Sequence, residues 1–157
     1  MSKTSKKSKL DTYILDKLVW RIIDNPQQAQ IFGKLIDLDE YFTVVASGTI
    51  KLLLPTSIPK AGDVFVLDHM LEIKKQRIRV ADILIKIFKF YNSSKVTRDD
   101  VLRLKVVTSA SIHVDKLLAQ FDTGEKVLKF RDFLETSNQT FAGLVHEKSN
   151  IYSVVIR

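Results

Sequence analysis

The sequence predicts a single α+β domain, residues 10–157, preceded by a basic flexible N-terminal arm, residues 1–9. The prediction rests on a length of 157 residues, a hydrophobic content of 45%, and apolar patterns that alternate between helical and extended spacing. A chain of this length can bury about 70% of the surface that its unfolded form exposes, which is enough for one core. Glycine and proline number only five and three, so low-complexity and collagen-like classes are excluded.

Two helices are predicted in the first part of the domain. Apolar residues recur every four positions from Leu10 to Ile22, which is the spacing of one helix face. Asn25 and Pro26 end this helix and suit the start of a second one, as its N-cap and its first residue. We expect the second helix to end near Ile36.

Extended structure is predicted next. Residues 41–54 are expected to form a hairpin, because aromatic and aliphatic residues flank the turn pair Ser47-Gly48. Residues 55–62 contain two prolines and are expected to form a loop, and residues 64–67 are a second apolar run. Residues 68–73 follow no clear period and receive no assignment.

A central buried helix is predicted over residues 77–91. Polar residues recur there in one narrow stripe at helical spacing, and nearly all the others are apolar. A helix with so narrow a polar stripe is covered on most of its sides. Since each large apolar side chain contributes about 1.5–3 kcal/mol when buried, this helix is expected to be a main source of stability.

The C-terminal half is predicted to contain two shorter helices and a hairpin. The helices are expected at residues 97–104 and 110–121, and the hairpin strands at residues 141–145 and 151–156. Residues 105–112 fit either a strand or a turn. The element order is that of a winged helix, in which the third helix enters the major groove of DNA. Residues 110–121 are therefore the candidate base-reading helix.

The residue types that most enzymes require are sparse. The chain has no cysteine, which excludes disulfides, thiolate nucleophiles and cysteine-ligated metal centres. Its three histidines are too far apart in sequence to form a local metal clip, and no glycine-rich phosphate loop or nucleophile elbow is present. We therefore expect a non-enzymatic protein without a cofactor or a metal, although an active site assembled from distant residues stays open.

No export or membrane segment is predicted. The N-terminal lysines are not followed by the apolar run of a secretory signal. No stretch approaches the roughly 18–20 apolar residues that span a bilayer. The expected location is intracellular, in the cytoplasm or the nucleus, as a soluble protein.

Positive charge is the feature that points to a partner. The chain has 25 basic and 18 acidic residues, a formal net charge of +7, with basic residues concentrated in the arm and within residues 74–79. Such clusters can neutralise phosphates and release counterions, which makes binding salt-dependent. They can also face an anionic lipid surface or form a solvated edge. The predicted nucleic-acid-binding residues are these cations and two outward residues of the candidate reading helix: Lys6, Lys7, Lys9, Lys74, Lys75, Arg77, Arg79, His113 and Lys116.

A partial resemblance supplies an alternative function. The stretch Phe130–Phe133 with the segment FAGLVHEKSNIYSVVI (141–156) resembles the C-terminal helix and hairpin of vesicular rhabdovirus matrix proteins, and Gly48–Leu52 and the lysine-rich N-terminus have counterparts there. The segments are spaced differently in this chain, so no family assignment follows. The resemblance implies a viral structural or assembly protein whose basic face contacts membrane or ribonucleoprotein and which self-associates. The first expectation remains a nucleic-acid-binding protein, for DNA or RNA, with a regulatory or replication-related role.

Overall fold

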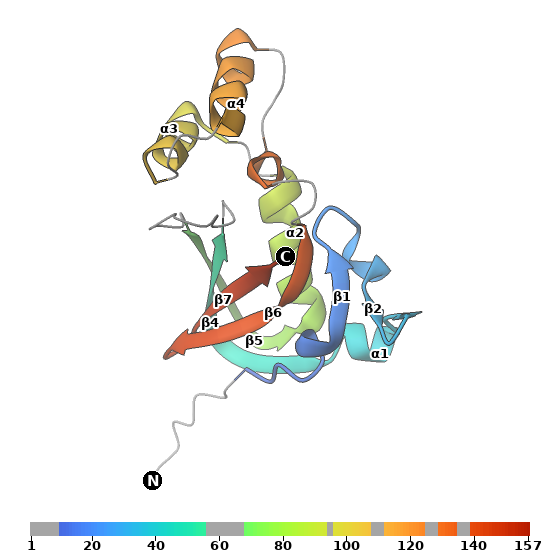
Figure 1. Ribbon diagram of the computed structural model, residues 1–157. Helices are drawn as coiled ribbons and strands as arrows, with labels where there is room; N and C mark the ends of the chain where they lie inside the picture. Colours follow the sequence, from blue (N-terminus) through green and yellow to red (C-terminus); the bar gives the residue numbers. More distant parts are fainter. Residues whose placement is uncertain (1–9, 56–67, 94–95, 108–111, 125–128, 135–138) are drawn as a thin grey trace.

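The protein has a mixed α+β architecture built on one sheet, seen here in a computed structural model of residues 1–157 (Figure 1). The structure describes residues 10–55, 68–93, 96–107, 112–124, 129–134 and 139–157. Within them, seven strands form the order β3-β2-β1-β6-β7-β4-β5. The strands are β1 (Leu18–Arg21), β2 (Gln30–Ile31), β3 (Lys34–Leu35), β4 (Val44–Pro55), β5 (Asp68–Arg79), β6 (Thr140–Lys148) and β7 (Ile151–Ile156).

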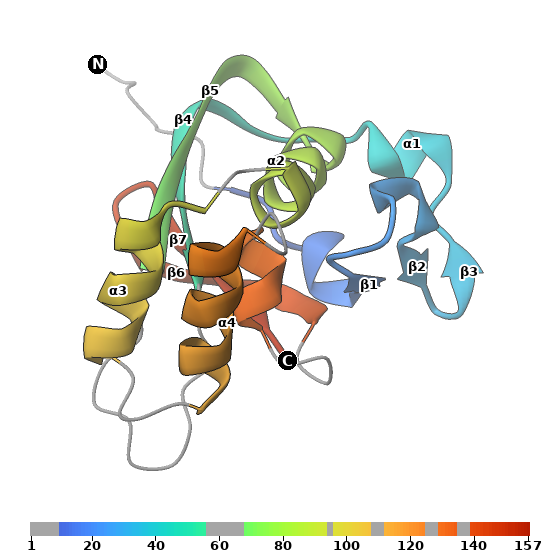
Figure 2. The same cartoon turned by 90° about the horizontal axis from the view of Figure 1, so that it is seen from above.

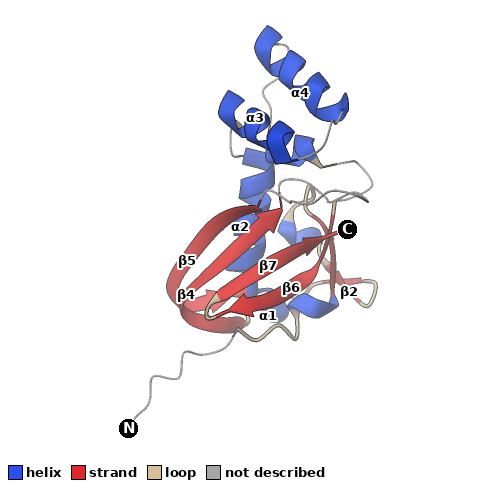
Figure 3. Ribbon diagram, turned by 60° about the vertical axis from the view of Figure 1, so that its left-hand side comes forward, coloured by secondary structure: helices blue, strands red, loops and turns tan. Residues whose placement is uncertain are grey.

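Four α-helices and three short 3₁₀ segments occupy the rest of the described chain. They are α1 (Leu38–Tyr41), α2 (Val80–Ser93), α3 (Arg98–Val107), α4 (Ile112–Thr123), η1 (Leu15–Lys17), η2 (Pro26–Gln28) and η3 (Phe130–Phe133). Helix α2 lies behind the strands β4, β5, β6 and β7. Helices α3 and α4 lie side by side beyond the C-terminal end of α2 (Figure 3). Seen from above, α1 and the β2–β3 hairpin lie together at one side of the molecule (Figure 2).

The predicted first helix is wrong, because residues 15–21 form η1 and then strand β1. A spacing of four residues corresponds to two side-chain periods of a strand and also to about one turn of a helix. Leu18, Trp20 and Ile22 are all buried, and this alternation identifies the strand. Trp20 packs against Phe141 of β6, which pairs with β1.

The predicted second helix is also replaced by extended structure. Asn25 does cap a turn as expected, since its Oδ1 accepts a hydrogen bond from the Gln27 amide at 2.9 Å, but the helical segment stops at Gln28. Strands β2 and β3 follow as a tight hairpin around Phe32 and Gly33. The sequence therefore predicted the position of the cap correctly, but the helical segment that follows the cap is much shorter than predicted.

Residues 44–55 form one continuous strand rather than the predicted hairpin. Ser47 and Gly48 lie at a β-bulge, where the register with β5 shifts between Ala46 and Gly48. Gly48 has φ +88°, which glycine adopts without strain. The antiparallel partner of β4 is β5, and β5 contains residues 68–73, which received no assignment from the sequence. The predicted apolar run at residues 64–67 and the arm at residues 1–9 lie outside the described residues.

The central helix α2 begins three residues later than predicted, because residues 77–79 continue strand β5. The Asp82 carboxylate accepts a hydrogen bond from the Arg79 amide at 2.8 Å and so caps the helix at this point. Ile83, Leu84 and Ile87 are fully buried on the side of α2 that faces the core.

The C-terminal hairpin is not the wing of a winged helix. Strand β6 pairs with β1 and with β7, and β7 pairs with β4, so the hairpin lies in the middle of the sheet. A wing projects from its domain beside the reading helix and cannot be enclosed by strands on both sides. Within the ambiguous segment, residues 105–107 belong to α3 and Ile112 begins α4, whereas residues 108–111 lie outside the described residues.

Candidate nucleic-acid interface

Four predicted site residues share one strand at the edge of the sheet. Lys74, Lys75, Arg77 and Arg79 all lie on β5, and all four are exposed. Among the described strands, β5 is the last in the sheet order, so one of its sides has no strand partner there. We call these four residues the β5 basic edge. Lysine-rich edges also protect sheets from pairing with other chains, which is the structural alternative to a binding role.

The bulge explains why so many basic side chains are exposed together. Gly48 lies opposite Lys75 and Ala46 opposite Ile78, so β5 has an extra residue between these pairs. An extra residue interrupts the alternation of inward and outward side chains. Ile73 and Ile78 are buried, and all four residues between them are exposed.

The cations of the β5 basic edge differ in their partners. The Lys75 ammonium lies 2.9 Å from the Asp82 carboxylate at the start of α2, which places it on the helix side of the sheet. Within the described part of the chain, neither Lys74, Arg77 nor Arg79 forms an ion pair. Three of the four charges are thus available to a ligand, and Lys75 is partly neutralised.

A hollow lies beside the bulge. It has a volume of about 650 Å³ and is lined by Ser47, Gly48, Lys74, Lys75 and Gln76. A Cβ built on Gly48 would meet no atom within 4 Å, so the space above this residue is open. The two ammonium groups and the Gln76 amide can all donate hydrogen bonds to anionic oxygens.

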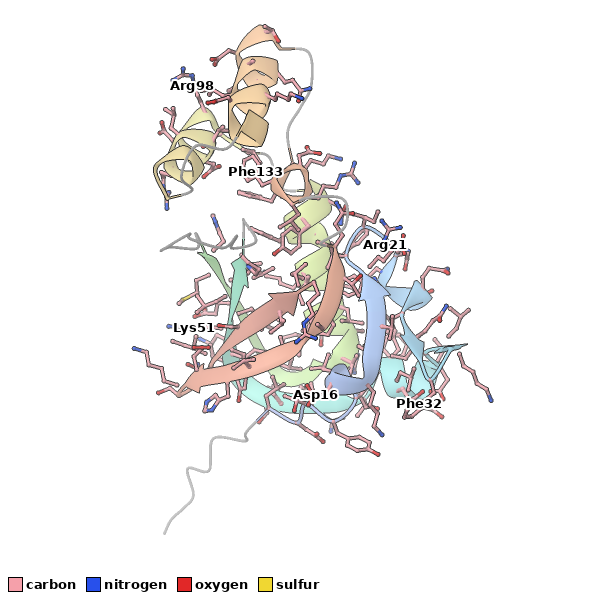
Figure 4. All side chains as sticks on the ribbon, in the orientation of Figure 1. Asp16, Arg21, Phe32, Lys51, Arg98 and Phe133 are labelled. Carbon is pink, nitrogen blue, oxygen red and sulfur yellow. The ribbon has the colours of Figure 1, made fainter. Side chains whose placement is uncertain are left out.

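The sheet adds one cation that sequence reasoning missed. Lys51 is half-buried on β4, where it lies opposite Glu72 of β5 and next to Ile151 of β7 (Figure 4). Strand alternation from Thr49, which lies opposite Lys74, would have placed Lys51 on the same face. The signal was lost because residues 41–54 were assigned to a hairpin. Glu72 reduces the positive charge at this position.

The other predicted residues do not join this surface. Lys6, Lys7 and Lys9 lie outside the described residues, and His113 and Lys116 belong to α4. Helix α4 packs against η3, whose Phe130 stacks on Phe90 near the C-terminal end of α2. The β5 basic edge meets the N-terminal end of the same helix, and a helix of this length spans about 21 Å. The structure therefore separates the candidate reading helix from the basic strand.

Ion pairing in the α3–α4 pair is local. Arg98 Nε lies 2.9 Å from Asp122 Oδ1, and this hydrogen bond, with the negative charge of Asp122, raises the pKa of Arg98. The pair joins two exposed side chains and leaves the arginine charged at every physiological pH.

The described residues contain no group of three histidine or acidic side chains that could hold a metal ion. The His69 ring lies against the stacked rings of Phe90 and Phe130, and His146 Nε2 lies 2.7 Å from the Ser149 carbonyl oxygen. None of the described helices is long and apolar enough to cross a membrane.

Comparison with known proteins gives no family for this chain. It matches no protein-family model, and no curated protein and no solved structure shows significant similarity to it. The partial resemblance to rhabdovirus matrix proteins therefore gains no support, and function has to be argued from the surface chemistry.

Proposed function

We propose that the protein binds nucleic acid without catalysis through the β5 basic edge. The observation that carries the proposal is the bulge, which exposes a run of basic side chains on an edge strand beside an open hollow. Lys74, Arg77 and Arg79 supply charges that no described acid neutralises. A net charge of +7 adds long-range attraction for a polyanion.

The mechanism is phosphate contact rather than base reading. Lysine and arginine side chains that contact phosphates release condensed counterions, and this entropy drives binding. Such contacts position a protein on its ligand but carry no sequence information. Because α4 lies at the other end of α2, the proposal assigns no base-reading role to His113 or Lys116. The lysines of the N-terminal arm would add further phosphate contacts.

Salt dependence is the test of this mechanism. We expect the logarithm of the affinity for a short DNA or RNA duplex to fall linearly with the logarithm of salt concentration, with a slope of about −0.9 per phosphate contacted. The double variant Lys74→Glu/Arg77→Glu should reduce the slope by about 2 and weaken binding at least tenfold. Lys75 is left intact, since a glutamate there would face Asp82 and disturb the start of α2.

A matched control tests whether affinity depends on the position of the cations or only on the net charge of the chain. Lys86 and Lys89 are exposed on α2, so Lys86→Glu/Lys89→Glu changes the net charge by the same amount at another place. This control should keep most of the affinity. Equal losses in both variants, or no binding of the wild-type chain to DNA and RNA, would contradict the proposal. Binding to vesicles of anionic lipid in place of nucleic acid would favour the matrix-type alternative.

A further inference from the structure

An exposed apolar surface surrounds the tip of the β2–β3 hairpin and extends to Phe42, near the Arg79 end of the β5 basic edge. Phe32 occupies the tip and is 82% exposed (Figure 4). Other large apolar side chains of the neighbouring segments are exposed as well: Tyr13, Val19, Leu35, Leu38 and Phe42. We call these six residues the Phe32 corner.

The backbone at the tip does not explain why a phenylalanine is present. Phe32 and Gly33 have φ values of 53° and 79°, so both central residues of the two-residue turn are left-handed. Turns of this kind favour Asn-Gly, and a bulky aromatic residue is disfavoured in the first position. The side chain contributes little to the core at this exposure. The residue type is therefore better explained by a contact with another molecule.

Contacts connect several side chains of the Phe32 corner. Lys17 Nζ lies 3.5 Å from the centre of the Tyr13 ring and 5.4 Å from that of Phe32, and so connects the two aromatic side chains. Val19 and Leu35 flank Gln30 in one cross-strand row, which places them on one face of the small hairpin sheet. Helix α1 lies next to this hairpin (Figures 1 and 2).

The segment that contains the corner is acidic, whereas the chain as a whole is basic. Residues 10–43 contain six acidic and three basic residues, a net charge of −3, in a protein whose total charge is +7. Asp16, Asp37 and Asp39 are exposed there and outnumber the two cations of the corner, Lys17 and Lys34. Carboxylates around an apolar surface oppose its approach to an anionic membrane. They suit instead a partner whose surface is basic with apolar residues beside it.

The chain itself presents such a surface. We propose that the Phe32 corner of one molecule docks on the β5 basic edge of a second copy. The strand pair β4–β5 presents an exposed apolar side chain beside its cations, since Val44 lies directly opposite Arg79. This inference goes beyond the proposed function and does not depend on it.

The two surfaces cannot meet within one molecule along their whole length. Phe32 lies at one side of the molecule, and Lys51, near Thr49 and its partner Lys74, lies at the other (Figure 4). A contact between two different surfaces leaves one of each unused in a dimer, so further copies can add. Association is therefore head-to-tail, which builds a closed ring or an open chain, and nucleic acid competes with it for the β5 basic edge.

Sedimentation velocity of the full chain at low salt tests the proposal. We expect species larger than a dimer that grow with concentration and dissociate as salt is raised. Phe32→Asn should weaken association at least tenfold and leave the fold intact, because Asn-Gly is the preferred pair for this turn. Val145→Thr, which changes an exposed aliphatic residue on β6, should leave association unchanged.

Mixing two defective variants shows whether the contact joins different surfaces. Phe32→Asn lacks the corner and Lys74→Glu/Arg77→Glu lacks the edge, so each alone should be monomeric. An equimolar mixture should form a dimer that grows no further. A monomeric wild-type chain at low salt, or association that survives in either variant alone, would overturn the proposal. So would Phe32-dependent binding to anionic vesicles by a chain that does not self-associate.

The same variants keep the two proposals apart. Phe32→Asn retains every cation of the β5 basic edge, so it should bind nucleic acid at least as tightly as the wild-type chain. Loss of self-association with unchanged nucleic-acid binding would support both proposals together. Self-association without any nucleic-acid binding would support the docking contact and refute the proposed function.

Discussion

Tyr41 of α1 is buried within the influence of Asp82 at the start of α2. Its side chain is buried on α1, and burial, followed by the negative charge of Asp82 on α2, raises the pKa of its phenol above the ordinary value of about 10. Both effects disfavour the phenolate. The residue is therefore stable as a neutral phenol in the core and costly to ionise there.

This shift predicts how stability changes in alkaline solution. A group whose pKa is raised by folding contributes stability below its unfolded pKa and loses it as pH rises through the folded value. The melting temperature should therefore fall above about pH 10, and Tyr41→Phe should reduce this fall because phenylalanine does not titrate. Thermal melts between about pH 8 and 11 measure the effect. Tyr13→Phe is the matched control, since Tyr13 is exposed, and an equal reduction in that variant would contradict the assignment.

Single residues also show where sequence reasoning reached its limit. The exposure of Lys74 and Arg77 was predicted correctly from their charge. The ion pair between Lys75 and Asp82 was not, because the predicted helix included residue 77 and so hid the change from strand to helix at residue 80. Phe32 was missed as well. Nothing in a local pattern distinguishes a buried phenylalanine from one at the tip of a hairpin.

At the scale of elements, spacing alone misled where two periods coincide. Apolar residues every four positions fit a helix and a strand equally well, and the strand β1 forms because β6 provides its partner from the far end of the chain. The pair Ser47-Gly48 suits a turn and a bulge alike, and pairing with β5 decides for the bulge. The C-terminal hairpin was predicted correctly because its two strands are adjacent in sequence.

Asn92, buried at the end of α2, links this helix to the residue that follows β1 and to η3. Its Nδ2 donates hydrogen bonds to the carbonyl oxygens of Ile22 and Phe88 at 2.7 and 2.9 Å, and its Oδ1 accepts one from Arg131 at 3.1 Å. If Asn92 is removed, the groups that it bonds stay away from water without a hydrogen-bond partner. This raises the free-energy cost of replacing Asn92.

Asn92→Ala should therefore lower the free energy of unfolding by about 1–3 kcal/mol. Urea denaturation followed by the fluorescence of Trp20, which is 2% exposed and the only tryptophan, measures this change. Asn150→Ala is the matched control. Asn150 donates one hydrogen bond to the Thr49 carbonyl from a half-buried position, so its loss should cost less. A cost for Asn92→Ala no larger than that of the control would show that these links contribute little.

At the scale of the whole molecule, charge is distributed unevenly. The segment at residues 10–43 is acidic and contains the Phe32 corner, whereas the β5 basic edge lies on a later part of a basic chain. If both proposals hold, nucleic acid and a second copy of the chain bind the same strand. Raising the nucleic-acid concentration should then dissolve the assembly, and this competition makes the β5 basic edge a switch between the two states.

The molecule also divides into parts of unequal stability. Strands β6 and β7 are enclosed by β1 and β4, with Phe141, Tyr152 and Val154 buried between them and the rest of the core. Helices α3 and α4 lie beyond the sheet and pack on each other, and α4 also packs on η3 (Figure 3). Their ion pair, Arg98–Asp122, is exposed, and exposed pairs contribute little to stability.

Hydrogen exchange on the full chain should therefore separate these two parts. Amides in β6 and β7 should exchange only through global unfolding, because opening them breaks the middle of the sheet. Amides in α3 and α4 should exchange faster, through a local opening that leaves the sheet intact, and Arg98→Ala should change their exchange only slightly. Val101 of α3 is fully buried, so Val101→Ala should accelerate exchange in α3 and α4 much more than in β6. Equal protection of helices and strands would show instead that the described chain unfolds as one cooperative unit.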